Sequence, residues 1–339
     1  MAPLSSLATS ADVHAHVPKP KFRLHLDDLR HAGSTSFLSR VPNPLLTLET
    51  ALQAIIRHLY TSPTDSDRDA LSSAVPRPRI PSFSPSIPPT RSVTLILRDF
   101  DGIAYTTGTD YDKEIHFSLS YIRARADAAC ELAGVLTHEL VHCYQHTSPR
   151  ALEADDRDET DAANSEKDSN IPHPPGGLIE GIADFVRLKA GLAPPHWKRP
   201  SSSKDRAENW DQGYQHTAYF LAWLEDVRVG VGAVGMLNDR LLRVGYVGES
   251  TRVTTGDAGE NDTDGSGRSY QESFWVGLFG VGVLELWEEY VLLFYSERNS
   301  GLRKGMLPLL RFQTPILNSS ILHSPDDLSQ AGRLVKEKD

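Results

Sequence analysis

The 339-residue sequence predicts an α+β fold with two lobes. Short strand patterns lie between residues 92 and 122, and they indicate a small, mostly antiparallel sheet in the first lobe. An apolar helical pattern follows at 134–146, and we expect this buried helix to pack in the same lobe. A second apolar helical pattern begins at Gly176 and ends at Gly191, and it opens a lobe made mostly of helices.

Composition and charge restrict the class of protein. Hydrophobic residues make up 39% of the chain and charged residues 24%, as in globular proteins. The formal net charge of −10 argues against nucleic-acid binding, because a protein that neutralises phosphates needs a basic surface. The most apolar stretch, residues 274–294, contains three glutamates and therefore predicts an amphipathic core helix and no membrane partner.

Two features bear on the cellular compartment. No apolar run of signal-peptide length follows Met1, which leaves the compartment open, with the cytoplasm slightly favoured. The two cysteines of the chain, Cys130 and Cys143, lie far apart along one predicted helix. A disulfide between them is therefore not expected.

The order of these patterns predicts one main domain, residues 21–315, between a flexible tail at 1–20 and a C-terminal tail at 316–339. Apolar residues recur at helical spacing from Pro44 to Tyr60 and predict one packed helix. Strands are predicted at 92–97, 102–107 and 115–122. Three stretches inside the domain are expected to be loops: the proline-rich residues 61–90, the acidic insertion at 150–172 and the low-complexity residues 248–269.

The most informative motif is the H-E-x-x-H pattern formed by His138, Glu139 and His142. On a helix, residues four apart project from one face about 6 Å apart along the axis, so both imidazoles can bind one zinc ion. Glu139 then lies beside that ion, where a carboxylate can act as general base toward metal-activated water. The alternative is an amphipathic helix with exposed histidines, which the apolar neighbours Leu140 and Val141 disfavour.

A catalytic zinc site usually has three protein ligands, and His146 is a poor candidate for the third. It follows His138 by eight residues, which is roughly 12 Å along an unbroken helix. Glu180 is a better candidate, because it shares a second buried helix with Asp184, one turn later. Two carboxylates at that spacing are costly to bury unless positive charge compensates for them. We therefore expect Glu180 to bind zinc and Asp184 to accept the outer N–H of a ligating histidine. The alternative is a surface-facing pair of carboxylates.

These segments resemble the basic secretory protein family of plants and bacteria, zincin-type peptidases on the thermolysin-like side, with a glutamate ligand. The resemblance is carried by four blocks: Val93 to Tyr121, Gly134 to Gln145, Pro175 to Trp197 and Trp210 to Tyr214. It implies a zincin-like fold, one zinc ion, and hydrolysis of peptide bonds in a peptide or protein substrate. The family's basic charge and secretion do not carry over, because this chain is acidic and shows no signal peptide.

Peptide hydrolysis also requires a donor that stabilises the oxyanion. Tyr214 is our candidate, with His216 behind it, whereas the alternative role for Tyr214 is that of an aromatic core residue. If the strand at 115–122 lies at the sheet edge, an extended substrate could pair with it.

A second function belongs to a different class of protein. A non-catalytic protein of the defence or peptide-binding type would use the same zinc site for stability, or the cleft for binding alone. Glu139 favours catalysis, because a purely structural zinc site has no use for a carboxylate beside an open metal position.

Overall fold

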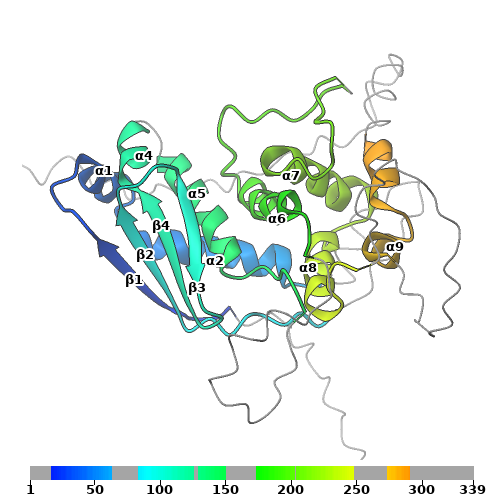
Figure 1. Ribbon diagram of the computed structural model, residues 1–339, viewed down its shortest axis with the longest axis horizontal. Helices are drawn as coiled ribbons and strands as arrows, with labels where there is room; N and C mark the ends of the chain where they lie inside the picture. The colour runs from blue at the N-terminus through cyan, green and yellow to red at the C-terminus, as the bar shows by residue number, and fades with distance from the viewer. Residues whose placement is uncertain are drawn as a thin grey trace, which may run out of the picture. The chain divides into compact units, whose positions relative to one another are not determined.

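The computed structural model describes residues 17–62, 83–125, 129–149, 173–202, 204–247 and 273–290, all within the unit formed by residues 1–302 (Figure 1). The acidic insertion, the low-complexity loop and the C-terminal tail lie outside the described residues, as do most of the N-terminal tail and of the proline-rich loop. The domain boundaries therefore stay a prediction. No helix within the described ranges has both the length and the apolar character that a membrane crossing needs.

One mixed sheet is built from strands whose order in space differs from their order in the chain. The strands are β1 (Lys21–Leu26), β2 (Ser92–Arg98), β3 (Ala104–Gly108) and β4 (Asp112–Ser118), arranged as β1-β2-β4-β3. β2 pairs in parallel with both β1 and β4, whereas β3 pairs antiparallel with β4. The predicted α+β class and small sheet are confirmed, but the prediction of a mostly antiparallel sheet is wrong.

The parallel pairings follow from connections that strand patterns do not reveal. The chain between β1 and β2 contains α1 (Ala32–Arg40) and α2 (Pro44–Leu59), and this helical crossover returns β2 in the direction of β1. β3 then runs back along the outer edge, and β4 enters between β2 and β3 (Figure 1). A meander, which the close spacing of the three strands favours, would have placed β3 in the middle.

The third predicted strand, residues 115–122, is a strand only in its first half. β4 ends at Ser118, and α4 (Leu119–Ala124) begins at the next residue. Tyr121 N donates a hydrogen bond to the Ser118 hydroxyl at 3.3 Å, so this serine caps the helix. The prediction was wrong here because apolar alternation continues into the helix, and only the capping serine marks the change.

The remaining helices agree with the sequence in part. They are α5 (Ala129–His142), α6 (Gly176–Lys189), α7 (Tyr214–Trp223), η2 (Leu224–Arg228), α8 (Ala233–Arg243) and α9 (Phe274–Phe279). α2 and α6 confirm the predicted helices, whereas α5 stops four residues before residue 146, its predicted end. The single helix predicted at 274–294 is wrong, because Gly280, with a φ of 76°, ends α9 and helical residues resume at 283–290. As expected, both cysteines are free.

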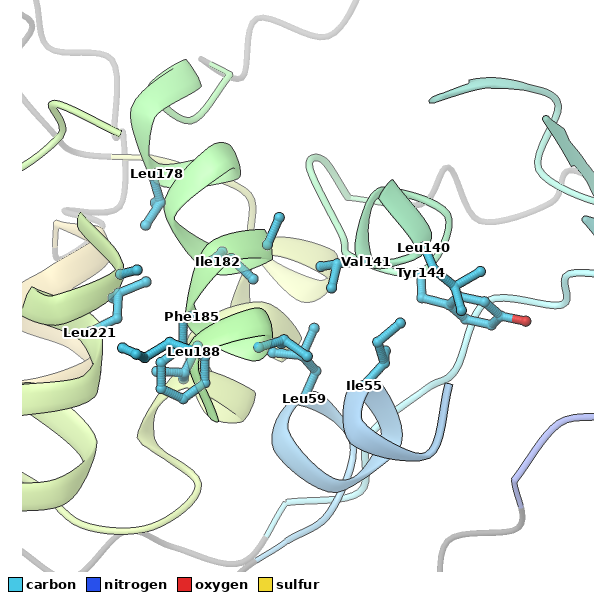
Figure 2. Packing of buried hydrophobic residues seen from close by; sticks show 14 of the residues in the cluster. Ile55, Leu59, Leu140, Val141, Tyr144, Leu178, Ile182, Phe185, Leu188 and Leu221 are labelled. Carbon is cyan, nitrogen blue, oxygen red and sulfur yellow. The ribbon is translucent and has the colours of Figure 1, made fainter. Parts of the chain in front are cut away.

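A shared apolar core holds α2, α5 and α6 together (Figure 2). Ile55 and Leu59 of α2 point toward Val141 of α5 and Ile182 of α6, and all four side chains are fully buried. Each such aliphatic side chain contributes about 1.5–3 kcal/mol when it leaves water. α5 also contacts β3 and β4, so this core fixes α6 relative to both α5 and the sheet.

α6 and α7 approach each other closely at two glycines of α6. A Cβ atom added to Gly177 would lie 1.7 Å from Asp211 O, and one added to Gly181 would lie 2.2 Å from Thr217 Cγ2. Neither position can therefore carry a side chain without moving the start of α7. The two glycines explain how the first residue of α7, Tyr214, comes to lie beside α6.

This close approach can be tested by adding a single methyl group. We expect Gly181→Ala to lower the free energy of unfolding by about 1–3 kcal/mol, because the new Cβ overpacks the contact with Thr217. Gly176→Ala is the matched control, since nothing lies within 4 Å of a Cβ atom there, and its effect should stay within about 0.5 kcal/mol. Urea unfolding of both variants measures the difference. Equal stability of the two would contradict this packing of α6 on α7.

Candidate metal centre

The candidate centre lies where α5 and α6 face each other. His138 and His142 are four residues apart on α5, and Glu180 and Asp184 are four residues apart on α6, so each pair occupies one face of its helix. The two helices are in contact. Among the described residues, His138, His142 and Glu180 form a group whose ligand atoms all lie within 4.8 Å of one another. The structure thus brings together the three residues predicted to bind metal.

Three potential ligand atoms converge in this group. His138 Nε2 lies 3.1 Å from His142 Nε2 and 3.1 Å from Glu180 Oε2. The other oxygen of Glu180, Oε1, lies 3.9 Å from His142 Nε2. Lone pairs this close to one another repel unless a proton or a cation lies between them. Two imidazoles and one carboxylate facing a cleft form the donor set of a catalytic zinc site, so these residues fit a divalent cation.

Asp184 orients the first of the two histidines. It is 2% exposed, and His138 Nδ1–H donates to its Oδ1 at 2.7 Å. An ionised carboxylate only accepts hydrogen bonds, so the neutral imidazole carries its proton on Nδ1 and keeps a lone pair on Nε2. That lone pair faces Glu180 and His142. Asp184 thus makes the contact with a histidine that we expected, and its role at a metal site stays a prediction.

The charges of the group are strongly coupled. Burial opposes a positive charge on His138, but its hydrogen bonds to Asp184 and Glu180 outweigh this effect and raise the pKa of His138 to about 10. Burial and the neighbouring His138 lower the pKa of His142 to about 4. Burial acts to raise the pKa of Glu180, but the hydrogen bond with His138 outweighs it and lowers that pKa. Without an ion, a proton on His138 thus balances the neighbouring carboxylates, and a bound cation would take over that role.

Glu139 lies beside His138, and it is held by a residue that the sequence did not point to. The Thr106 hydroxyl of β3 lies 2.8 Å from Glu139 Oε2 and 2.9 Å from the Glu139 backbone oxygen. No residue in the described ranges binds the other carboxylate oxygen, Oε1. Burial raises the pKa of Glu139, although His138 opposes this effect. Thr106 lies within β3, and only the packing of β3 beside α5 could have revealed its contact with Glu139.

Tyr214 lies over the centre and adopts an unusual backbone conformation. Its ring is stacked on that of His138, with the ring centroids 6.4 Å apart and an interplanar angle of 15°. It is 59% exposed, which excludes the alternative role as an aromatic core residue. Its φ of 46° is sterically costly for a residue with a Cβ atom. The negative charge of Glu180 raises the pKa of Tyr214, so its hydroxyl stays a hydrogen-bond donor.

Two residues just after α5, Gln145 and His146, point in different directions. His146 turns away from the centre, with Nε2 2.9 Å from Ser86 O and 3.3 Å from the Tyr60 hydroxyl, in agreement with its rejection as a ligand. Gln145 instead faces the centre, and its Nε2 lies 2.9 Å from His142 Nδ1. Nothing in the sequence marked Gln145 as part of the centre except its position three residues after His142, a helical-spacing signal.

The centre opens into a cleft of about 990 Å³. The walls come from β3, α5, α6 and the start of α7, and they include both candidate oxyanion donors, Tyr214 and His216. Further along the same faces of α5 and α6, an ion pair joins Glu131 Oε2 to Arg187 Nη2 at 2.7 Å. Nothing in the sequence pointed to this pair, because its partners are distant in the chain.

The edge strand of the cleft is not the one expected. The segment 115–122 does not lie at the edge, because β4 is flanked by β2 and β3. β3 pairs only with β4 among the described strands, and its residues from Ala104 to Thr106 line the cleft. β3 is therefore the edge strand that lines this space.

The family of the chain follows from comparison with known proteins. A family model described as peptidase of plants and bacteria matches residues 19–290. No curated protein matches the chain, and no solved structure does. The matched region includes every residue of the centre described above. The chain therefore belongs to the basic secretory protein family, the peptidases of plants and bacteria.

Proposed function

We propose that this protein is a zinc-dependent metallopeptidase with a zincin-like, two-lobed architecture. The convergence of His138, His142 and Glu180 in an open cleft, with Glu139 beside them, is the observation that carries the proposal. Two imidazoles and one carboxylate favour zinc over magnesium or calcium, which prefer oxygen ligands. The family to which the chain belongs consists of peptidases, which supports a peptide or protein as the substrate.

In the proposed mechanism, His138, His142 and Glu180 would hold one zinc ion, and the bound ion would supply Lewis-acid polarisation of the scissile carbonyl and a lowered pKa of water. Glu139 accepts the proton of the attacking water and delivers it to the leaving amine. The hydrogen bond from Thr106 to Oε2 orients this carboxylate and leaves Oε1 for the proton. Tyr214 donates a hydrogen bond from its neutral hydroxyl to the developing oxyanion.

The substrate is proposed to bind in extended form along the outer side of β3. Backbone groups of an edge strand pair with a peptide of any sequence, which supplies affinity without restricting the side chains. β3 lines the cleft next to α5 and carries Thr106, which contacts the proposed general base. A peptide on this edge would therefore lie beside the reacting groups.

A non-catalytic protein with the same ion is the competing function. A structural zinc site is closed by four protein ligands, whereas these three ligand residues face a cleft. Glu139 is also buried next to the ligands, although burial disfavours its charged form. Because the burial of the Glu139 carboxylate costs free energy, its presence at this place supports catalysis over binding alone.

Metal removal tests the proposed function directly. We expect elemental analysis of the purified protein to give one zinc ion per chain, and hydrolysis of a broad peptide library to require it. Dialysis against 1,10-phenanthroline should abolish hydrolysis, and added zinc should restore it. Full activity of the metal-free protein would overturn the proposal. A zinc-loaded protein that cleaves no member of the library would support the non-catalytic function.

A further inference from the structure

We propose that Gln145 is a positioning residue for the metal centre, and that its side-chain amide, turned so that its oxygen faces the ring, holds His142 in the tautomer that can bind a metal ion. This inference rests on the proposed zinc site and adds a residue to it. Gln145 is 8% exposed, and its side-chain amide lies 2.9 Å from His142 Nδ1. It thus occupies the same place toward His142 that Asp184 occupies toward His138.

The chemistry of imidazole explains why such a partner is needed. A histidine that binds metal through Nε2 must carry its proton on Nδ1, so the partner of Nδ1 must accept a hydrogen bond. Asp184 meets this requirement for His138, because a carboxylate has no proton to donate. For His142, the amide oxygen of Gln145 can serve as the corresponding acceptor. The two histidines would then be oriented by different groups, one charged and one neutral.

The orientation of the Gln145 amide decides which tautomer it supports. With Nε2 toward the ring, as observed, the amide donates to Nδ1 and the imidazole proton resides on Nε2, facing His138. Oε1 of Gln145 is meanwhile buried and has no hydrogen-bond partner among the described residues. Rotation of the amide by half a turn brings this oxygen to Nδ1, where it accepts the Nδ1–H of His142 and leaves the Nε2 lone pair for the ion.

The neutral partner also suits the charge of the site. His138, Glu139, Glu180 and Asp184 already place three carboxylates around one imidazole. A second carboxylate behind the histidines would add negative charge that the ion alone would have to compensate. An amide provides the acceptor without that charge. Its nitrogen can donate to His142 Nδ1 without the ion, and its oxygen can accept from Nδ1–H when the ion is bound.

The test is the zinc affinity of variants that keep the volume of Gln145 but change its chemistry. We expect Gln145→Met, which retains packing but has no comparable acceptor, to weaken zinc binding by about 10–100-fold. Gln145→Glu, which accepts but does not donate, should bind zinc within about 10-fold of the wild type. Gln212→Met is the matched control, because Gln212 lines the same cleft and no hydrogen bond in the described part of the chain joins its side chain to either histidine. Its affinity should be unchanged.

Competition with a chromophoric chelator gives the zinc affinities, and nitrogen-15 NMR of the imidazoles reports the tautomer of His142 in each zinc-loaded variant. Circular dichroism of each metal-free variant shows that it is folded. A Gln145→Met protein that is folded and binds zinc as tightly as the wild type would overturn the inference and leave the zinc site intact. A wild-type protein without measurable zinc affinity would instead overturn the proposed function.

Discussion

Replacement of Glu139 by glutamine is expected to lower kcat for peptide hydrolysis by about 10²–10⁴-fold, the range that general acid–base catalysis supplies. The amide has nearly the volume of the carboxylate and still accepts the hydrogen bond from Thr106, but it cannot take up a proton from water. Zinc content should stay at one ion per chain, because Glu139 is not among the three converging ligands.

Steady-state hydrolysis of a fluorogenic peptide, with zinc measured in the same samples, checks this expectation. Glu49→Gln provides the control, since Glu49 is an exposed residue of α2. Unchanged hydrolysis by the Glu139→Gln protein would show that another group moves the proton. A loss of both zinc and activity would instead point to a structural role for Glu139.

The second large effect is expected at Glu180, the proposed zinc ligand on α6. Glu180→Gln is expected to weaken zinc binding by more than about 100-fold. That is the largest typical effect of losing a residue that only hydrogen-bonds to a metal ligand. Asp184→Asn should fall within that range, at about 10–100-fold, because Asp184 contacts His138 and not the ion. Both variants should lose hydrolysis at limiting zinc, and only Asp184→Asn should regain it when zinc is added in excess.

Isothermal titration of the metal-free proteins with zinc measures this order of affinities. The two variants are matched, because each converts one carboxylate of the same helix into an amide. If Glu180→Gln binds zinc more tightly than Asp184→Asn, the assignment of the third ligand to Glu180 is wrong. If both bind like the wild type, the ion lies elsewhere.

Much of the candidate site could be predicted because helical spacing fixes local geometry. His138 and His142 share a face of α5, and Glu180 and Asp184 share a face of α6, whatever the rest of the chain does. Because His138 and Asp184 are buried and His142 and Glu180 are partly buried, each pair needed hydrogen-bond or ionic partners. Two correct helices were therefore enough to place both pairs toward the same point.

The parts of the site and of the fold that the sequence did not predict depend on contacts between distant parts of the chain. Thr106 reaches Glu139 only because β3 occupies the outer edge of the sheet, and the order of the strands is not encoded in their apolar alternation. Helix limits failed for a related reason, since Ser118 and Gly280 are small signals inside longer apolar patterns. Tyr214 was a candidate from its segment alone, and its position over His138 follows from the close packing at Gly177 and Gly181.

The arrangement of ligands on two helices has a consequence for the life of the protein in a cell. α5 and α6 are separated in the chain by the acidic insertion, and a bound ion would fasten them together from their facing sides. Binding to the folded state alone adds its free energy to that of folding. Chains that never acquire zinc would then open more often and be degraded sooner. With the proposed zinc site, the supply of zinc would determine how many molecules survive as well as how many work.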